Sequence, residues 1–264
     1  MRRHPMRLRF WKMSGTGNDF ILLAGLPRGF SGAALARRLC RRRAAIGADG
    51  ILVLSLRGGR LRLDYWNADG SIAFCGNGSR CAALWAKTQG WVKGSRFVLD
   101  TIRGALAVHV TGKGRAEVSM PAPKDPRLGL KLKALGRAWT VHFVDTGTPH
   151  AVVFVPNVEK IDVKPLGRAL RFHKAFGKPG ANVDFVAVTN GTLSLRTYER
   201  GVEDETDSCG TGVMAAAFVA CALGKTGPST RVKVRGGAVL NVSLLEGALL
   251  EGPADIVFTG EVAL

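Results

Sequence analysis

The chain has 264 residues, 46% of them hydrophobic, and a formal net charge of +18, which excludes a disordered chain and allows one large domain or two ordinary ones. Its five cysteines include no Cys-x-x-Cys pair, which excludes the disulfide framework of a small secreted protein. The basic start, residues 1–6, has no apolar secretory segment and the apolar run 213–223 is too short to span a bilayer, so we expect a cytoplasmic protein that binds no membrane.

The first half of the chain alternates short apolar strands with turns. Ser31 is expected to cap a helix from Ala33 to Cys40, and a second helix is expected over residues 76–87. Strands are expected near residues 8–11, 21–23, 51–54, 62–66, 97–99, 105–110 and 116–120.

The proline-rich residues 121–126 predict a linker, and the order of elements then repeats in outline. Helices are expected over 163–176 and from 210 to a C-cap near Gly224. Strands are expected near residues 141–144, 151–155, 183–188, 193–198, 232–234, 239–244 and 256–258. We therefore predict two α+β domains, residues 1–120 and 121–255, with a final strand of about 256–264 rejoining the first.

Two short motifs lie half a chain length apart, each where a glycine-rich loop becomes an apolar helix. They are Cys75-Gly76-Asn77-Gly78 and Cys209-Gly210-Thr211-Gly212. Free amide N–H groups and the positive end of a helix dipole stabilise a thiolate or a carboxylate at such a place. The repetition indicates an internal duplication, and the apolar helices are typical of burial inside a curled sheet. We expect both loops to meet at one ligand site between the halves.

Two thiols in matching surroundings are compatible with a redox pair, a metal site, or acid–base chemistry on opposite faces of one carbon. We predict no metal, because no further Cys or His stands at ligand spacing beside either loop. Redox sites usually place both cysteines at one helix start, which favours the third option. One thiolate would remove a proton next to a carboxylate while the opposite thiol delivers one. The amides expected to bind that carboxylate belong to Gly76, Asn77, Gly210 and Thr211.

The remaining interpretation of the two loops is purely structural, with each cysteine buried in an ordinary helix-starting turn. The three other cysteines are expected to be small buried apolar groups of helices. They are Cys40, Cys81 and Cys221.

Seven polar side chains stand in or beside turns at predicted strand ends. They are Asn18, Asn67, Asn77, His150, Asn182, Glu199 and Arg200. Each alone is compatible with local turn chemistry, a structural histidine or a surface ion pair. Together they would bind a substrate that carries both ammonium and carboxylate groups.

These motifs together resemble the diaminopimelate epimerase family over nearly the whole chain. The resemblance is carried by residues 12–20, 46–50, 67–71, 75–78, 148–151, 182–183, 199–201 and 209–212. It implies two pseudo-symmetric domains, each a curled, mostly antiparallel sheet around a central apolar helix. It also implies a cytoplasmic homodimer that epimerises LL-2,6-diaminopimelate to the meso isomer for lysine and peptidoglycan precursors, without pyridoxal phosphate or any other cofactor.

The resemblance implies a role for each matching residue. Cys75 and Cys209 would be the two acid/bases, and His150 and Glu199 would modulate the pKa values of their thiols. The implied substrate-binding residues are Asn18, Asn67, Gly76, Asn77, Asn182, Glu199, Arg200, Gly210 and Thr211. Two departures affect recognition of the distal end of the substrate: Gly50 stands where many members carry glutamine, and Thr148 where many carry asparagine.

Two other functions are compatible with the sequence. A proline or hydroxyproline racemase-type epimerase has a similar layout with two cysteines, but Asn77 and Glu199-Arg200 favour the two-ended substrate. The charge of +18 allows a basic nucleic-acid-binding protein. Most basic residues are scattered, and the sequence has no RNP, zinc-finger or KH motif, so we expect no specific nucleic-acid partner.

Overall fold

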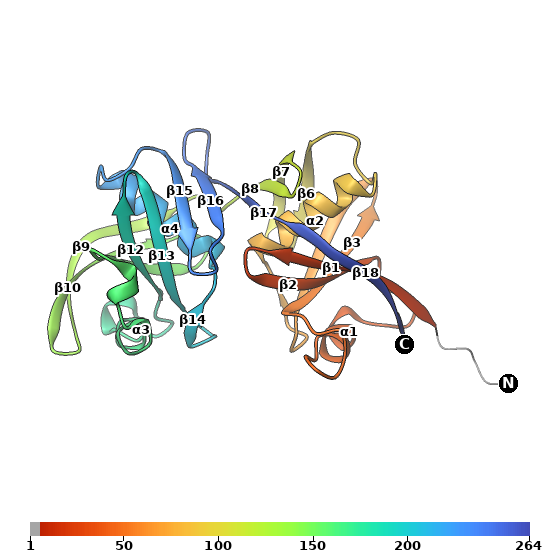
Figure 1. Cartoon of the computed structure of the whole chain (residues 1–264), viewed down its shortest axis with the longest axis horizontal. Helices are drawn as coiled ribbons and strands as arrows, with labels where there is room; N and C mark the ends of the chain where they lie inside the picture. The colour runs from red at the N-terminus through yellow and green to blue at the C-terminus, as the bar shows by residue number, and fades with distance from the viewer. Residues whose placement is uncertain (1–5) are drawn as a thin grey trace. The chain divides into compact units, whose positions relative to one another are not determined.

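The computed structural model describes residues 6–264 and divides into two compact units (Figure 1). Unit 1 comprises the described residues up to 118 together with 252–264, and unit 2 comprises residues 119–251. Residues 1–5, on which part of the prediction about a secretory segment falls, lie outside the described residues. Over residues 6–264, no helix combines the length and the apolar character needed to cross a membrane.

Unit 1 is a mostly antiparallel sheet with two helices. The helices are α1 (Gly32–Leu39) and α2 (Gly76–Thr88). The strands are β1 (Arg7–Gly15), β2 (Asn18–Ala24), β3 (Gly50–Arg57), β4 (Arg60–Asn67), β5 (Ile72–Ala73), β6 (Arg96–Thr101), β7 (Gly104–Gly112), β8 (Arg115–Ser119) and β18 (Asp255–Ala263). The pairing runs β18-β1-β2-β3-β4-β6-β7-β8, with β5 also beside β4.

Unit 2 is built in the same way. Its helices are α3 (Val163–Arg171) and α4 (Gly210–Ala222), with short 3-10 turns at Val158–Lys160 and Lys174–Phe176. Its strands are β9 (Lys124–Ala134), β10 (Arg137–Asp145), β11 (Pro149–Phe154), β12 (Asn182–Thr189), β13 (Thr192–Glu199), β14 (Asp204–Thr206), β15 (Ser229–Val234), β16 (Val239–Ser243) and β17 (Leu249–Pro253). The pairing runs β9-β10-β11-β12-β13-β15-β16-β17, with β14 also beside β13.

The two units therefore share one topology, including the places where strands run parallel. In unit 1 the parallel pairs are β2–β3 and β4–β6, and their connections carry α1 and α2. In unit 2 the parallel pairs are β11–β12 and β13–β15, and their connections carry α3 and α4. A parallel pair needs a long crossover, and each helix supplies one. The predicted α+β fold with two pseudo-symmetric halves is confirmed.

The two helices that follow the cysteine loops are buried on nearly every side. In α2 every residue from Asn77 to Ala86 is buried, and α4 is apolar around its whole circumference. A helix of this kind is typical of a protein interior. The outer helix α1 is different, because it buries Leu35, Ala36 and Leu39 against the sheet and turns Arg37 and Arg38 outward. Its predicted cap is confirmed, since Ser31 Oγ accepts a hydrogen bond from the Ala34 amide.

Most predicted elements are found, but two boundaries were wrong. The linker predicted over 121–126 ends early, because Lys124 already begins β9. An irregular register between β9 and β10 accommodates Pro126, which has no N–H for a regular ladder. The helix predicted over 163–176 stops at Arg171, since His173 caps a separate 3-10 turn. Strands β5, β9, β14 and β17 were not predicted.

Gly50, one of the two departures from the family pattern, lies where two strands approach closely. A Cβ atom at Gly50 would lie 2.3 Å from the carbonyl oxygen of Trp66 and 2.5 Å from the ring of Tyr65. The backbone of a paired strand cannot move away cheaply, so we expect Gly50→Ala to lower the free energy of unfolding by about 1–3 kcal/mol. Urea denaturation measures this. Gly112→Ala is the control, because a Cβ atom there meets nothing within 4 Å. Equal urea midpoints of unfolding for the two variants would contradict the prediction.

Candidate active site

Cys75 is the N-cap residue of α2 and holds its sulfur against the first turn of the helix. Its backbone is extended, and its Sγ accepts a hydrogen bond from the Gly78 amide at 3.4 Å. The Ser79 amide closes the first turn onto the Cys75 carbonyl oxygen at 2.9 Å. Helix geometry leaves the amides of Gly76 and Asn77 for other acceptors. The half-buried thiol therefore lies in an electropositive setting that favours a thiolate or a bound carboxylate.

Two of the predicted binding residues, Asn18 and Asn77, are hydrogen-bonded to each other. Asn77 Nδ2 donates to Asn18 Oδ1 at 2.8 Å, and Asn18 Nδ2 donates to Asp49 Oδ2 at 2.9 Å. Arg42 Nη2 donates to the other oxygen of Asp49 at 2.8 Å. Each amide nitrogen carries two hydrogens, so each has a second N–H beyond the one used in these hydrogen bonds.

Asn67 lies at the end of β4 with its amide fixed from both sides. The Tyr65 hydroxyl donates to Asn67 Oδ1 at 2.8 Å, and Asn67 Nδ2 donates to Ser71 Oγ at 2.9 Å. Burial raises the pKa of Tyr65, and the nearby Cys75 sulfur contributes to the rise, so the phenol keeps the hydrogen that it donates. Asn67 thus also presents one further N–H.

Cys209 is the N-cap residue of α4 and is more deeply buried than Cys75. The Val213 amide donates to the Cys209 carbonyl oxygen at 2.9 Å, and Sγ lies 3.4 Å from Thr211 Oγ1. Burial raises the pKa of the Cys209 thiol, and the negative charges of Glu199 and Asp184 raise it further. Unlike its counterpart in unit 1, this sulfur lies among carboxylates, which favour the protonated thiol.

His150 connects Thr211, which contacts the Cys209 sulfur, to a buried carboxylate. Its Nδ1 lies 2.6 Å from Asp184 Oδ2, and both side chains are fully buried. The Thr197 hydroxyl donates to Asp184 Oδ1 at 2.7 Å. An ionised carboxylate only accepts hydrogen bonds, so Nδ1 carries the hydrogen and Nε2 faces Thr211 Oγ1 at 2.9 Å.

Asn182 and Glu199 lie beside this group at neighbouring strand ends. Asn182 Oδ1 accepts from the Arg200 amide at 2.8 Å, and its Nδ2 donates to the Pro149 carbonyl oxygen at 3.0 Å. The Asn182 amide therefore ties the start of β11 to the end of β13. Burial raises the pKa of the Glu199 carboxyl group.

The predicted site residues thus form one group in each unit. Unit 1 contains Asn18, Asn67, Cys75, Gly76 and Asn77, and unit 2 contains His150, Asn182, Glu199, Arg200, Cys209, Gly210 and Thr211. The groups occupy equivalent places, because Cys75 and Cys209 are the N-caps of equivalent helices, and Asn67 and Glu199 end the equivalent strands β4 and β13.

Sequence reasoning missed two charged residues that support these groups. Arg80 is fully buried in α2 and bonds to Asn77, and Asp184 is fully buried in β12 and bonds to His150. A signal was present for both, because each is a single charged residue within a run of small or apolar residues. Such a charge is rarely buried without a partner.

The remaining cysteines do not join either group. Cys40 and Cys81 are buried as predicted, but Cys221 is only half-buried, because it lies near the C-terminal end of α4 where the helix leaves the interior. Within residues 6–264, no three His, Cys, Asp or Glu side chains gather as a metal ion would require.

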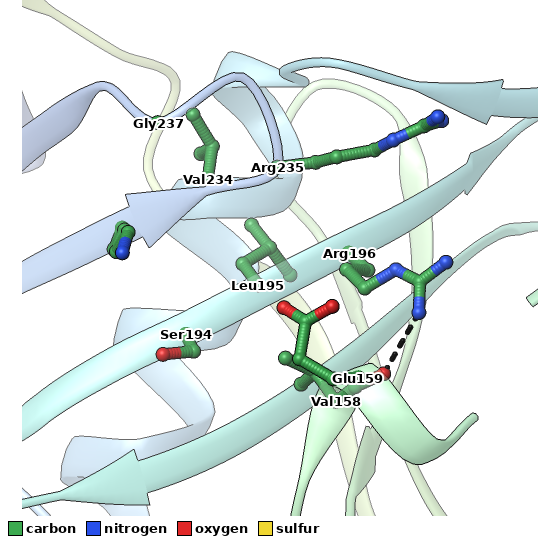
Figure 2. A pocket seen from close by; sticks show the side chains of 9 residues that line it. Val158, Glu159, Ser194, Leu195, Arg196, Val234, Arg235 and Gly237 are labelled. Carbon is green, nitrogen blue, oxygen red and sulfur yellow. Dashed lines mark hydrogen bonds between the residues drawn. The ribbon is translucent and has the colours of Figure 1, made fainter.

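A hollow of about 310 Å³ lies elsewhere on unit 2 (Figure 2). The guanidinium of Arg196 at its edge is bound by the Glu205 carboxylate at 2.6 Å and by the Val158 carbonyl oxygen at 2.9 Å. Its charge is therefore already balanced within the protein. The residues lining the hollow, all in the described part of the chain, include none of the predicted site residues.

The sequence matches a known family model and several known proteins. Residues 10–124 and 142–257 match the family model described as diaminopimelate epimerase. A diaminopimelate epimerase from Chlorobaculum tepidum is 40% identical over 261 residues, covering 96% of this chain and all of the relative. One from Aquifex aeolicus is 37% identical over 276 residues, covering 97% and 98%. The fold is also similar to that of a PhzF-family phenazine biosynthesis protein from Bacillus anthracis, with a TM-score of 0.75 at 14% identity, covering 98% of this chain and 100% of that structure.

The carboxylates near Cys209 predict a measurable effect on its thiol. Glu199→Gln removes a negative charge that raises the pKa of Cys209, so the pKa should fall. Below the pKa, the thiolate fraction grows about tenfold for each unit of decrease, so alkylation by iodoacetamide at fixed pH should be several-fold faster. Peptide mass spectrometry of a Cys75→Ala background measures the Cys209 rate. Glu159→Gln, at an exposed site, is the control, and an unchanged rate in Glu199→Gln would contradict the prediction.

Proposed function

The chain belongs to the diaminopimelate epimerase family, and we propose that it interconverts LL- and meso-diaminopimelate with Cys75 and Cys209 as paired acid/bases. It is an isomerase of the epimerase type. The reaction would supply precursors of lysine and peptidoglycan.

The observation that carries the proposal is the matched position of the two sulfurs. Each cysteine is the N-cap of a buried helix, and the two helices follow equivalent strands of one repeated topology. Two equivalent groups that each exchange a proton are what a reversible inversion at one carbon needs. The proposal requires both loops to face a single substrate molecule.

In the proposed reaction, the thiolate of one cysteine removes the α-proton, and a new S–H bond forms as the C–H bond breaks. The electron pair of the broken bond passes into the adjacent carboxylate, where amide N–H groups at the helix starts stabilise the added charge. The opposite cysteine then gives its S–H proton to the other face of the carbon and becomes the thiolate. The two sulfurs have exchanged protonation states, and no pyridoxal phosphate or metal is required by this scheme.

The loop amides and the polar groups would divide the substrate between them. Gly76, Asn77, Gly210 and Thr211 would hold the reacting carboxylate through backbone N–H groups. The second N–H groups of Asn18 and Asn67 suit carboxylate oxygens, while the Glu199 carboxylate suits an ammonium and the Arg200 guanidinium a carboxylate. Asn182 would act chiefly by holding Arg200 and His150 in place, because its amide is engaged within unit 2. We further propose a cytoplasmic homodimer, as in the family.

Removing either thiol should abolish the reaction. Because a positioned acid or base contributes on the order of 10²–10⁴-fold, Cys75→Ala and Cys209→Ala should each lose at least that much epimerisation while remaining folded. Separation of LL- and meso-diaminopimelate over time measures the activity, and circular dichroism checks the fold. Cys221→Ala, which changes a half-buried cysteine near the other end of α4, should retain activity. Substantial turnover by either of the first two variants would refute the paired-thiol scheme.

The charged pair at Glu199 and Arg200 predicts selectivity for a two-ended substrate. Proline has one ammonium and one carboxylate group and cannot contact both ends of the proposed site. We therefore expect the enzyme to epimerise diaminopimelate and to leave L-proline unchanged in polarimetry at equal concentrations. Racemisation of proline without epimerisation of diaminopimelate would reverse the choice of substrate.

A further inference from the structure

Arg80 is a buried cation beneath the Cys75 loop. It is 0% exposed and is the only charged residue in α2 before Lys87. Burying a guanidinium away from water costs free energy, so the contacts of Arg80 should show what its charge does there. None of the roles assigned above includes this residue in substrate binding or proton transfer.

A single nitrogen of Arg80 holds two different elements of unit 1. Its Nη2 donates to Thr16 Oγ1 at 2.6 Å and to Asn77 Oδ1 at 2.7 Å. Thr16 lies in the turn between β1 and β2 with φ of +53°, a left-handed conformation that is strained for a β-branched residue. Arg80 therefore ties this strained turn to the first turn of α2.

The bond to Asn77 fixes the orientation of two side-chain amides, those of Asn77 and Asn18. Because Arg80 is only a donor, Asn77 must turn its oxygen toward the guanidinium, and its nitrogen then faces Asn18. Asn18 must in turn accept with its oxygen and donate with its nitrogen to Asp49. If the Asn77 amide were reversed, its oxygen would face Asn18 Oδ1 and its nitrogen would face the Arg80 guanidinium, so both hydrogen bonds would be lost.

Unit 2 has no cation at the equivalent position, and its loop has no side-chain amide that would need one. The fifth residue after Cys209 is Met214, at the place that Arg80 occupies after Cys75, and it is also fully buried. The residue equivalent to Asn77 is Thr211, which accepts a hydrogen bond from Thr148 at 3.1 Å. A hydroxyl group rotates freely to suit its partners, whereas an amide has two distinct ends that must be oriented. The cation is thus present beneath the cysteine loop that carries an amide, Asn77, and absent beneath the loop that carries a hydroxyl, Thr211.

We propose that Arg80 is a positioning residue that orients the side-chain amides of Asn77 and Asn18 so that both present N–H donors to a substrate carboxylate. The expected effect of Arg80 on catalysis rests on the proposed function. The orientation of the two amides concerns unit 1 alone, so it can be tested without measuring turnover.

The test compares two replacements of Arg80. Arg80→Met copies the residue of unit 2 and keeps apolar volume without a donor, while Arg80→Lys keeps one cationic nitrogen that can donate twice. For a lost hydrogen bond of this kind, we expect Arg80→Met to raise KM for LL-diaminopimelate about tenfold or more, with a smaller change in kcat. Arg80→Lys should restore most of the loss. Equal behaviour of the two variants, or wild-type KM in both, would overturn the proposal.

A double variant separates positioning from general loss of structure. If Arg80 acts through Asn77, adding Arg80→Met to Asn77→Ala should change kcat/KM much less than adding it to the wild type. Full additivity of the two effects would overturn the proposal.

A measurement without substrate distinguishes this inference from the proposed function. In 15N NMR spectra, the side-chain amide hydrogens of Asn77 and Asn18 should exchange slowly in the wild type and in Arg80→Lys, and faster in Arg80→Met. Unchanged exchange in Arg80→Met would overturn the role of Arg80 even if the protein epimerises diaminopimelate. If the hydrogens exchange as expected but the wild-type protein does not epimerise diaminopimelate, the role of Arg80 stands and only the proposed function is contradicted.

Discussion

A sulfur atom at the N-cap of a buried helix is the feature that both units share and on which the proposed chemistry depends. Oxygen-bearing side chains usually fill this position, because they accept more strongly from the first-turn amides. Cysteine is a weaker cap because sulfur is a poor hydrogen-bond acceptor, although Cys75 Sγ still accepts from the Gly78 amide at 3.4 Å. The helices tolerate it because their stability comes from burial on nearly all sides rather than from capping. The position thus holds a thiol at the start of each helix.

The repeated topology supplies two such positions, and the side chains around them then differ. Where unit 1 has Phe20 opposite Gly50, unit 2 has His150 opposite Asn182. A buried cation, Arg80, lies beneath the first loop, whereas the carboxylates of Asp184 and Glu199 lie near the second sulfur. The two sulfurs thus have equivalent backbone positions but neighbours of opposite charge. Such a difference would favour the thiolate at Cys75 and the thiol at Cys209.

Much of this arrangement could be predicted from the sequence, because it follows from local patterns. The cysteine-glycine loops identified both helix starts, and Ser31 identified the start of α1. Strand β9 was missed because prolines in residues 121–126 predict a linker, whereas the irregular register with β10 that accommodates Pro126 is a tertiary effect. Arg80 and Asp184 were missed because each has a partner that is distant in sequence, Thr16 for Arg80 and His150 for Asp184, so only the folded chain shows why these charges are buried.

The most direct test of the two-base reaction is the fate of hydrogen at the inverted carbon during a single approach to equilibrium. LL-diaminopimelate is incubated with the enzyme in deuterated water, and both isomers are analysed by mass spectrometry at low conversion. Two opposed sulfurs predict one deuterium at the inverted carbon of the meso product and ordinary hydrogen in the remaining LL substrate. Product that keeps the original hydrogen would mean that a single group removes and returns the same proton, and would contradict the paired role of Cys75 and Cys209.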